Sequence, residues 1–191
     1  MLRIACLASA LLLAATLQSA ADEMPWDFAR LMAEFAQVQT SRAKYSEIRR
    51  VAALREPIAL SGTLYYSRPA HIEKRQVLPF REVIQVDREQ LTVEREGKTR
   101  TISLAGAPQL AALIESLRAT LAGDRAELER IYDVRLEGSR ERWSLKLIPR
   151  DAEIASLIDS ISFAGSGSRV SRVQILEPGG DSSVMTIQHE S

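Results

Sequence analysis

The stretch Ser61-Gly62-Thr63-Leu64-Tyr65-Tyr66-Ser67-Arg68-Pro69 decides the fold class of this chain. Its side chains alternate as in a β-strand, where successive residues point to opposite faces of a sheet. Leu64, Tyr66 and Arg68 therefore share one face, which is apolar and ends in a positive charge. The stretch predicts a sheet with one apolar side whose margin carries a fixed cation.

Further extended segments follow on both sides of this strand, separated by proline, glycine or Asp-Arg turns. We expect them near residues 43–55, 58–68, 71–78, 81–87, 90–96 and 99–104, and again near 131–137, 142–148, 158–163, 170–177 and 182–188. Short strands at this spacing are typical of an antiparallel meander. A sheet of about ten strands does not stay flat, so the sequence predicts one that curls.

Two amphipathic helices are predicted, at about residues 25–39 and 107–122, and a short one from Asp124 to Arg130. Their apolar side chains recur at helical spacing: Phe28, Leu31, Met32, Phe35 and Val38 in the first, and Leu110, Leu113, Ile114, Leu117 and Leu121 in the second. Each apolar face needs a surface to cover. We therefore expect an α+β fold, in which a curved antiparallel sheet forms an open, incomplete β-barrel and amphipathic helices cover its mouth.

The N-terminus has the three parts of a secretory signal peptide. Arg3 supplies the basic part, residues 4–17 the apolar part, and Ser19-Ala20-Ala21 the small-residue cleavage site. The apolar part is shorter than the ~20 residues that span a bilayer. We expect residues 1–21 to be removed and residues 22–191 to form a single domain that is soluble in the periplasm.

The composition excludes several function classes. Without the leader, 24 basic residues stand against 25 acidic ones, which does not suggest a nucleic-acid partner. The one cysteine, Cys6, lies in the leader, so no disulfide is expected. The two histidines, His71 and His189, are far apart and have no metal-ligand spacing. No catalytic motif is present either, so we expect no enzyme, no catalytic residue, no metal and no cofactor.

The segment with Gly62, Leu64, Arg68 and Pro69 resembles the periplasmic carriers of outer-membrane lipoproteins, the LolA/LolB-like family. In that family a Gly-x-Leu-x-x-x-Arg-Pro strand forms part of an open barrel that shelters acyl chains. The resemblance implies that Arg68 bonds backbone carbonyls of the lid helices and holds the empty cavity closed. Judged from its charge alone, Arg68 would be an ordinary surface arginine at a strand end.

The resemblance also implies a lipid-binding cavity and a function. The predicted cavity residues, each on the apolar side of its element, are Phe35, Tyr45, Leu64, Tyr66, Ile72, Leu113, Leu117 and Trp143. The implied function is a monomeric carrier that takes the acyl chains of a lipoprotein, or a related lipid-like product, from an inner-membrane donor transporter to an outer-membrane acceptor.

Departures from the family pattern point to a divergent, LolA-related subfamily. Ser41 stands where the family often has an aromatic residue, and Asp87-Arg88 replaces an Asp-Gly turn. Such a subfamily resembles those that accompany aryl-polyene pigment or other specialised outer-membrane lipid pathways. Two alternatives remain open: an exported half-barrel that has a filled interior and binds an envelope protein, and an enzyme acting on acyl or glycan substrates.

Overall fold

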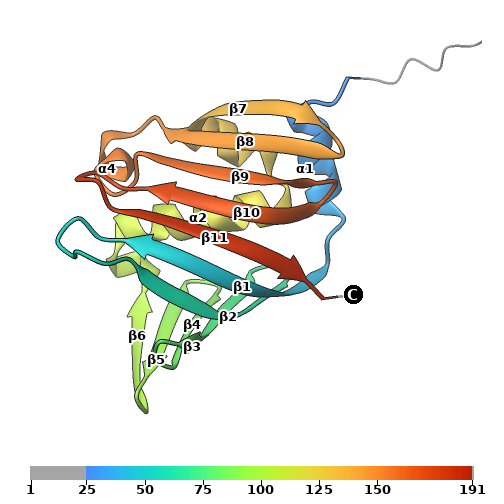
Figure 1. The fold of residues 1–191 in the computed structure, drawn as a ribbon. Helices are drawn as coiled ribbons and strands as arrows, with labels where there is room; N and C mark the ends of the chain where they lie inside the picture. Colours follow the sequence, from blue (N-terminus) through green and yellow to red (C-terminus); the bar gives the residue numbers. More distant parts are fainter. Residues whose placement is uncertain (1–24, 191) are drawn as a thin grey trace, which may run out of the picture.

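A computed structural model describes residues 25–190, and the statements below concern this part of the chain. The predicted leader, residues 1–21, lies outside the described residues. Eleven strands form one antiparallel sheet in the order β6-β5-β4-β3-β2-β1-β11-β10-β9-β8-β7 (Figure 1). The strands are β1 (Thr40–Arg50), β2 (Ile58–Ser67), β3 (His71–Leu78), β4 (Glu82–Asp87), β5 (Gln90–Arg95), β6 (Lys98–Ser103), β7 (Tyr132–Ser139), β8 (Arg142–Pro149), β9 (Ser160–Ser166), β10 (Arg169–Leu176) and β11 (Ser182–His189).

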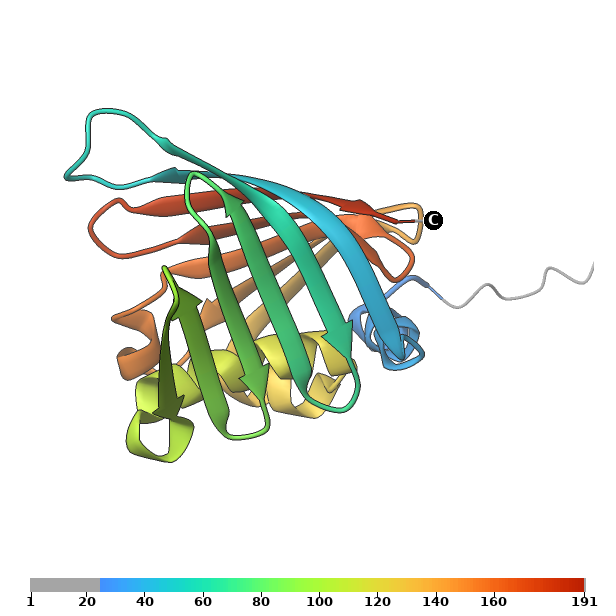
Figure 2. The ribbon, with the colours of Figure 1, turned by 90° about the horizontal axis from the view of Figure 1, so that it is seen from below.

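The sheet is curved and not closed, and the helices lie on its concave side (Figures 1 and 2). They are α1 (Phe28–Ala36), the 3₁₀ helix η1 (Leu104–Gly106), α2 (Pro108–Ala122), α3 (Arg125–Ile131) and the single turn α4 (Ala152–Ala155). In Figure 2, α2 runs beneath the strands and α1 lies near one end of it. The predicted fold class is confirmed.

Two meanders build the sheet, one from β1 to β6 and one from β7 to β11. They meet where β1 pairs with β11, from Ala43 opposite His189 to Arg50 opposite Ser182. The centre of the sheet therefore consists of strands that are almost the whole sequence apart.

The buried apolar side chains of the concave side form two separate clusters. The first cluster joins the helices α1, α2, α3 and α4 to β7, β8 and β9; its members are Leu31, Met32, Phe35, Ala119, Leu128, Ile131, Tyr132, Trp143, Leu145, Leu147, Ile154, Ile158, Ile161 and Phe163. The second cluster lies at the other end of the sheet and comprises Val86, Leu91, Leu104 and Ile114. Neither cluster has a buried member from β1, β2 or β11.

Among the boundaries that differ from those predicted, those of α1 and β1 differ most. Helix α1 begins at Phe28 and not at Pro25, because the Asp27 carboxylate accepts a hydrogen bond from the Arg30 N–H (2.9 Å) and caps the helix. Strand β1 ends at Arg50 and not near residue 55. The turn after it is tied to the β10–β11 turn by a bond from the Ala52 N–H to Asp181 Oδ1 (2.7 Å).

Candidate functional site

The register places the strand residues predicted for the cavity on the concave face. Trp143 marks this face, because its ring contacts the ring of Phe35 in α1 (centroids 5.8 Å apart). The pairing registers from β8 through β9, β10 and β11 to β1 place Tyr45 on the same face of the sheet as Trp143. Tyr45 faces Gly62, and alternation along β2 adds Leu64 and Tyr66, with Ile72 opposite Tyr66.

The predicted cavity residues nevertheless fall into different surroundings. Phe35 and Trp143 belong to the first cluster, whereas Ile72 packs against the second. Tyr45 and Tyr66 are buried and belong to neither, and Leu64 is half-buried. Leu117 is 37% exposed although helical spacing puts it on the same side of α2 as buried Ile114. The side chain of Leu113 lies outside the described part, so a shared lipid-binding surface stays a prediction.

Arg68 joins the rim of the sheet to the ends of two helices. Its Nη1 donates to the carbonyl oxygen of Ala36 (2.9 Å) and to that of Ala122 (3.3 Å). Ala36 is the last residue of α1 and Ala122 the last of α2. Carbonyls at a helix C-terminus lack an intrahelical donor and form the negative end of the helix dipole. One guanidinium therefore satisfies acceptors on both helices at once.

A charge cluster around one buried carboxylate lies on the concave face, and we call Glu47, Lys74, Arg49 and Ser183 the Glu47 cluster. The Glu47 carboxylate accepts from Lys74 Nζ (2.5 Å), Arg49 Nη2 (3.0 Å) and Ser183 Oγ (2.8 Å). Its side chain is 1% exposed. Burial raises the pKa of this carboxyl, but the bonds and charges from Lys74, Ser183 and Arg49 outweigh burial and hold the pKa below its usual value.

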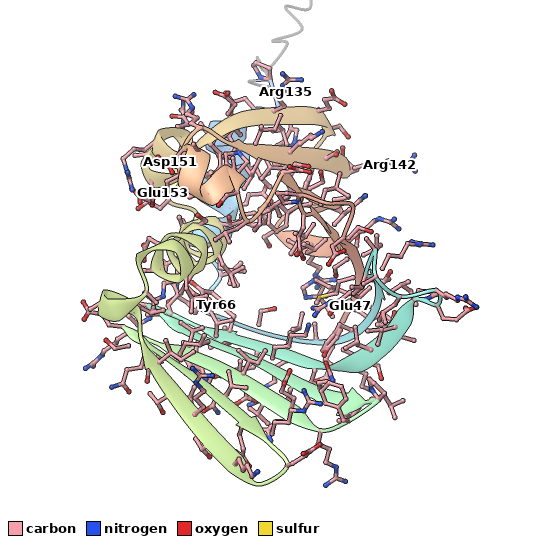
Figure 3. All side chains as sticks on the ribbon, turned by 90° about the vertical axis from the view of Figure 1, so that its left-hand side faces the viewer. Glu47, Tyr66, Arg135, Arg142, Asp151 and Glu153 are labelled. Atoms are coloured by element: carbon pink, nitrogen blue, oxygen red, sulfur yellow. The ribbon has the colours of Figure 1, made fainter. Side chains whose placement is uncertain are left out.

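Two tyrosine hydroxyls on the concave face are buried without a hydrogen-bond partner among the described residues. They belong to Tyr45 and Tyr66. Burial, reinforced by the charges of Glu47 and Glu82, raises the pKa of Tyr45 to about 12. Burial also raises the pKa of Tyr66, against the opposing charge of Arg68. Figure 3 looks along the concave side, and Glu47 and Tyr66 both border the opening between the sheet and α2 that the side chains leave.

The sequence prediction missed the Glu47 cluster. The available signal was a charged residue on the apolar side of a strand, since Glu47 shares its side with Tyr45 and Lys74 shares its side with Ile72. The pairing itself needs β1, β3 and β11 to be close together. That arrangement depends on contacts between distant parts of the chain.

A pocket of about 720 Å³ lies at the other end of the helices, between α2, α3, α4 and the turn before β5. Charged side chains dominate its lining, among them Glu115, Arg118, Glu127 and Glu153. None of the predicted cavity residues whose side chains the structure describes lines it. Its polarity makes it a poor surface for an acyl chain.

Within residues 25–190, no helix has the length and apolar character needed to cross a membrane. In the same part of the chain, no group of three or more His, Cys, Asp or Glu side chains is placed to hold a metal ion.

A family model described as outer membrane lipoprotein carrier protein LolA-like matches residues 20–184. The chain belongs to this LolA-like family. The wider LolA-like superfamily includes lipid-binding lipoprotein carriers, and its members are generally carrier or binding proteins. The family is periplasmic. The predicted family is thus confirmed.

Solved structures with low sequence identity are similar to this LolA-like chain. A LolA superfamily protein from Nitrosomonas europaea is 12% identical over 85% of this chain and 92% of its own, with a TM-score of 0.45. A putative outer membrane lipoprotein-sorting protein domain from Vibrio parahaemolyticus is 9% identical over 86% and 91%, with a TM-score of 0.47. The lipoprotein LppX from Mycobacterium tuberculosis is 13% identical over 83% and 93%, with a TM-score of 0.36. A search of curated proteins found no match.

Proposed function

We propose that this LolA-like chain is a periplasmic carrier of acyl chains. After removal of residues 1–21, the domain of residues 22–191 takes the acyl part of a lipoprotein, or of a related lipid-like product, from an inner-membrane donor transporter. It delivers this cargo to an outer-membrane acceptor as a monomer, without catalysis and without a cofactor. The observation that carries the proposal is the contact of Arg68 with the ends of α1 and α2.

Arg68 acts in this proposal as the lock of the empty carrier. A charge-assisted hydrogen bond contributes about 1.5–3 kcal/mol. Burying an acyl chain contributes about 0.8 kcal/mol per methylene, so a few methylenes offset the loss of the bonds to Ala36 and Ala122. The helices then move away from the rim when cargo enters and return when it leaves. Breaking the lock lowers the net affinity, which keeps the cargo transferable.

The middle of the concave face is the proposed acyl-binding surface. Under β8 the interior is filled, because Trp143, Leu145 and Leu147 are at most 1% exposed. The two clusters leave β1, β2 and β11 between them, where Leu64 is half-buried and Leu117 of α2 is 37% exposed. These apolar side chains support a position of the cargo between the clusters.

Native mass spectrometry of the protein purified from the periplasm tests this proposal. The polypeptide is expected to begin at Asp22 and to carry acylated species that organic solvent removes. Leu64→Asp places a charge on the concave face and is expected to abolish the bound species. The matched control is Thr63→Asp, because Thr63 is an exposed residue of the same strand. This variant is expected to retain the bound acylated species. A wild-type protein without bound acyl species, or a fully loaded Leu64→Asp variant, would contradict the carrier function.

A further inference from the structure

Tyr45 has an unpartnered hydroxyl on the concave face, beside the Glu47 cluster. Tyr45 is only 4% exposed, and its hydroxyl oxygen has no hydrogen-bond partner among residues 25–190. A buried hydroxyl without a partner loses the hydrogen bonds it would make to water. A ligand group that bonds to Tyr45 would restore one of them.

The position of the Tyr45 ring is set by its neighbours. Gly62 lies opposite Tyr45 on β2 and has no side chain, so the ring can extend across that strand. On β3, Lys74 Nζ lies 4.9 Å from the ring centroid, as in a cation–π contact. Lys74 is itself held by Glu47. The hydroxyl is therefore presented from a fixed ring and not from a mobile surface side chain.

The charges around Tyr45 are of both signs, and Glu47 is paired with both Lys74 and Arg49. The negative charges of Glu47 and Glu82 raise the pKa of the Tyr45 phenol, and the positive charge of Arg49 lowers it. Lys74 lies over the ring, so two acidic and two basic side chains surround it. The Glu47 carboxylate is already bonded to Lys74 and Arg49, so a charged ligand group would have to compete with these ion pairs. Because the phenol keeps its proton at neutral pH, it offers a neutral donor and acceptor.

We propose that the Tyr45 hydroxyl is a specificity-determining group that selects acyl chains carrying an uncharged hydroxyl along their length over plain hydrocarbon chains. This inference rests on the proposed function, since it assumes that acyl chains bind on the concave face. It adds the class of cargo: a hydroxylated acyl chain. Tyr66 carries the other unpartnered hydroxyl, but it lies about 13 Å further along the strand direction, four residues past Gly62, near Arg68.

Displacement of a fluorescent acyl probe by two matched esters tests the inference. Methyl oleate and methyl ricinoleate have the same chain and differ in one hydroxyl group. The mature wild-type protein is expected to bind methyl ricinoleate about three- to tenfold more tightly, the value of one additional hydrogen bond. Tyr45→Phe is expected to lower the affinity for methyl ricinoleate to that for methyl oleate and to leave the latter unchanged.

A variant on the opposite face of β2 serves as the control. Tyr65→Phe makes the same chemical change on the convex face, where Tyr65 contacts Arg42 and His71, and is expected to keep the preference. Equal affinities of the wild type for both esters, or a preference that survives in Tyr45→Phe, would overturn the inference while the carrier function stands. Failure to bind the probe at all would overturn both.

Discussion

Gly123 lies against the backbone of α1 so closely that a Cβ atom at this position would overlap the carbonyl oxygen of Met32. The same atom would come within 2.7 Å of the Ala36 amide nitrogen. Gly123 also ends α2 in a left-handed conformation, with φ of 71°. One glycine thus ends one helix and lets it approach the other, next to the Ala36 and Ala122 carbonyls that Arg68 contacts.

Gly123→Ala is expected to destabilise the fold by more than its backbone conformation explains. A positive φ costs an alanine about 1–2 kcal/mol, and overpacking against rigid backbone adds about 1–3 kcal/mol. Gly179→Ala is the matched control, because Gly179 has φ of 87° but nothing within 4 Å of the added atom. Urea denaturation measures both variants. Equal losses would show that α1 and α2 do not need this close approach.

Arg68→Leu is expected to produce a carrier that loads and does not unload. The variant removes the donor to Ala36 and Ala122 from the empty form, whereas the loaded form has already given up those bonds in the proposed cycle. The balance shifts toward the loaded form by about 1.5–3 kcal/mol. A transfer assay to outer membranes, together with the amount of loaded periplasmic complex, measures this. Arg135→Leu, on the exposed outer side of β7 (Figure 3), is the control, and wild-type transfer by Arg68→Leu would refute the lock.

Lys74→Met is expected to lower the free energy of unfolding by about 3 kcal/mol, because it removes one partner of a buried carboxylate. Glu47 then keeps only Arg49 and Ser183. The double variant Glu47→Gln/Lys74→Met removes the charge as well and is expected to recover most of the loss. An exposed pair, Arg125 with Glu129, provides the comparison, since Glu129→Gln is expected to cost less than about 1 kcal/mol. A double variant as unstable as Lys74→Met would argue against an uncompensated charge as the cause.

The contribution of Glu47 to stability is expected to depend on pH. Its pKa is lowered in the folded state, so the stabilisation is complete above the ordinary carboxyl pKa of about 4.3 and is lost as the pH falls below it. The difference in unfolding free energy between the wild type and Glu47→Gln should therefore shrink on acidification. Glu137→Gln, an exposed carboxylate on β7, controls for the general effect of acid. A difference that does not change with pH would show that Glu47 gains nothing from its ionised form.

Local patterns were sufficient to predict most of the fold. The segment predicted at 58–68 is β2, Ile58–Ser67, and the helix predicted at 107–122 is α2, Pro108–Ala122, because each combines an apolar period with a clear stop. The end of β1 was predicted too late. Its apolar pattern continues past Arg50, and what ends the strand is a contact with Asp181, which is distant in sequence.

The candidate site was harder to predict from the sequence than the fold, for a geometric reason. Alternation tells which face of the sheet a residue occupies, and it assigned Leu64, Tyr66 and Trp143 to the concave side. It does not tell how far apart they lie across an eleven-stranded sheet, so residues of different surroundings were predicted as one surface. The acceptors of Arg68 likewise depend on where α1 and α2 end in space, and only the family resemblance pointed to helix carbonyls.

The pairing of β1 with β11 is expected to form late in folding. Within each meander, strands that are neighbours in sequence pair with each other. The two meanders can join only after β11, residues 182–189, has been synthesised and released, because β11 is the strand that pairs with β1. Until then β1 and β10 present unpaired backbone groups, which are prone to intermolecular pairing. Closing such a distant pair is slow, because most of the chain must be ordered first. Chaperones that shield extended edges are therefore expected to matter most for this chain just before its last strand arrives.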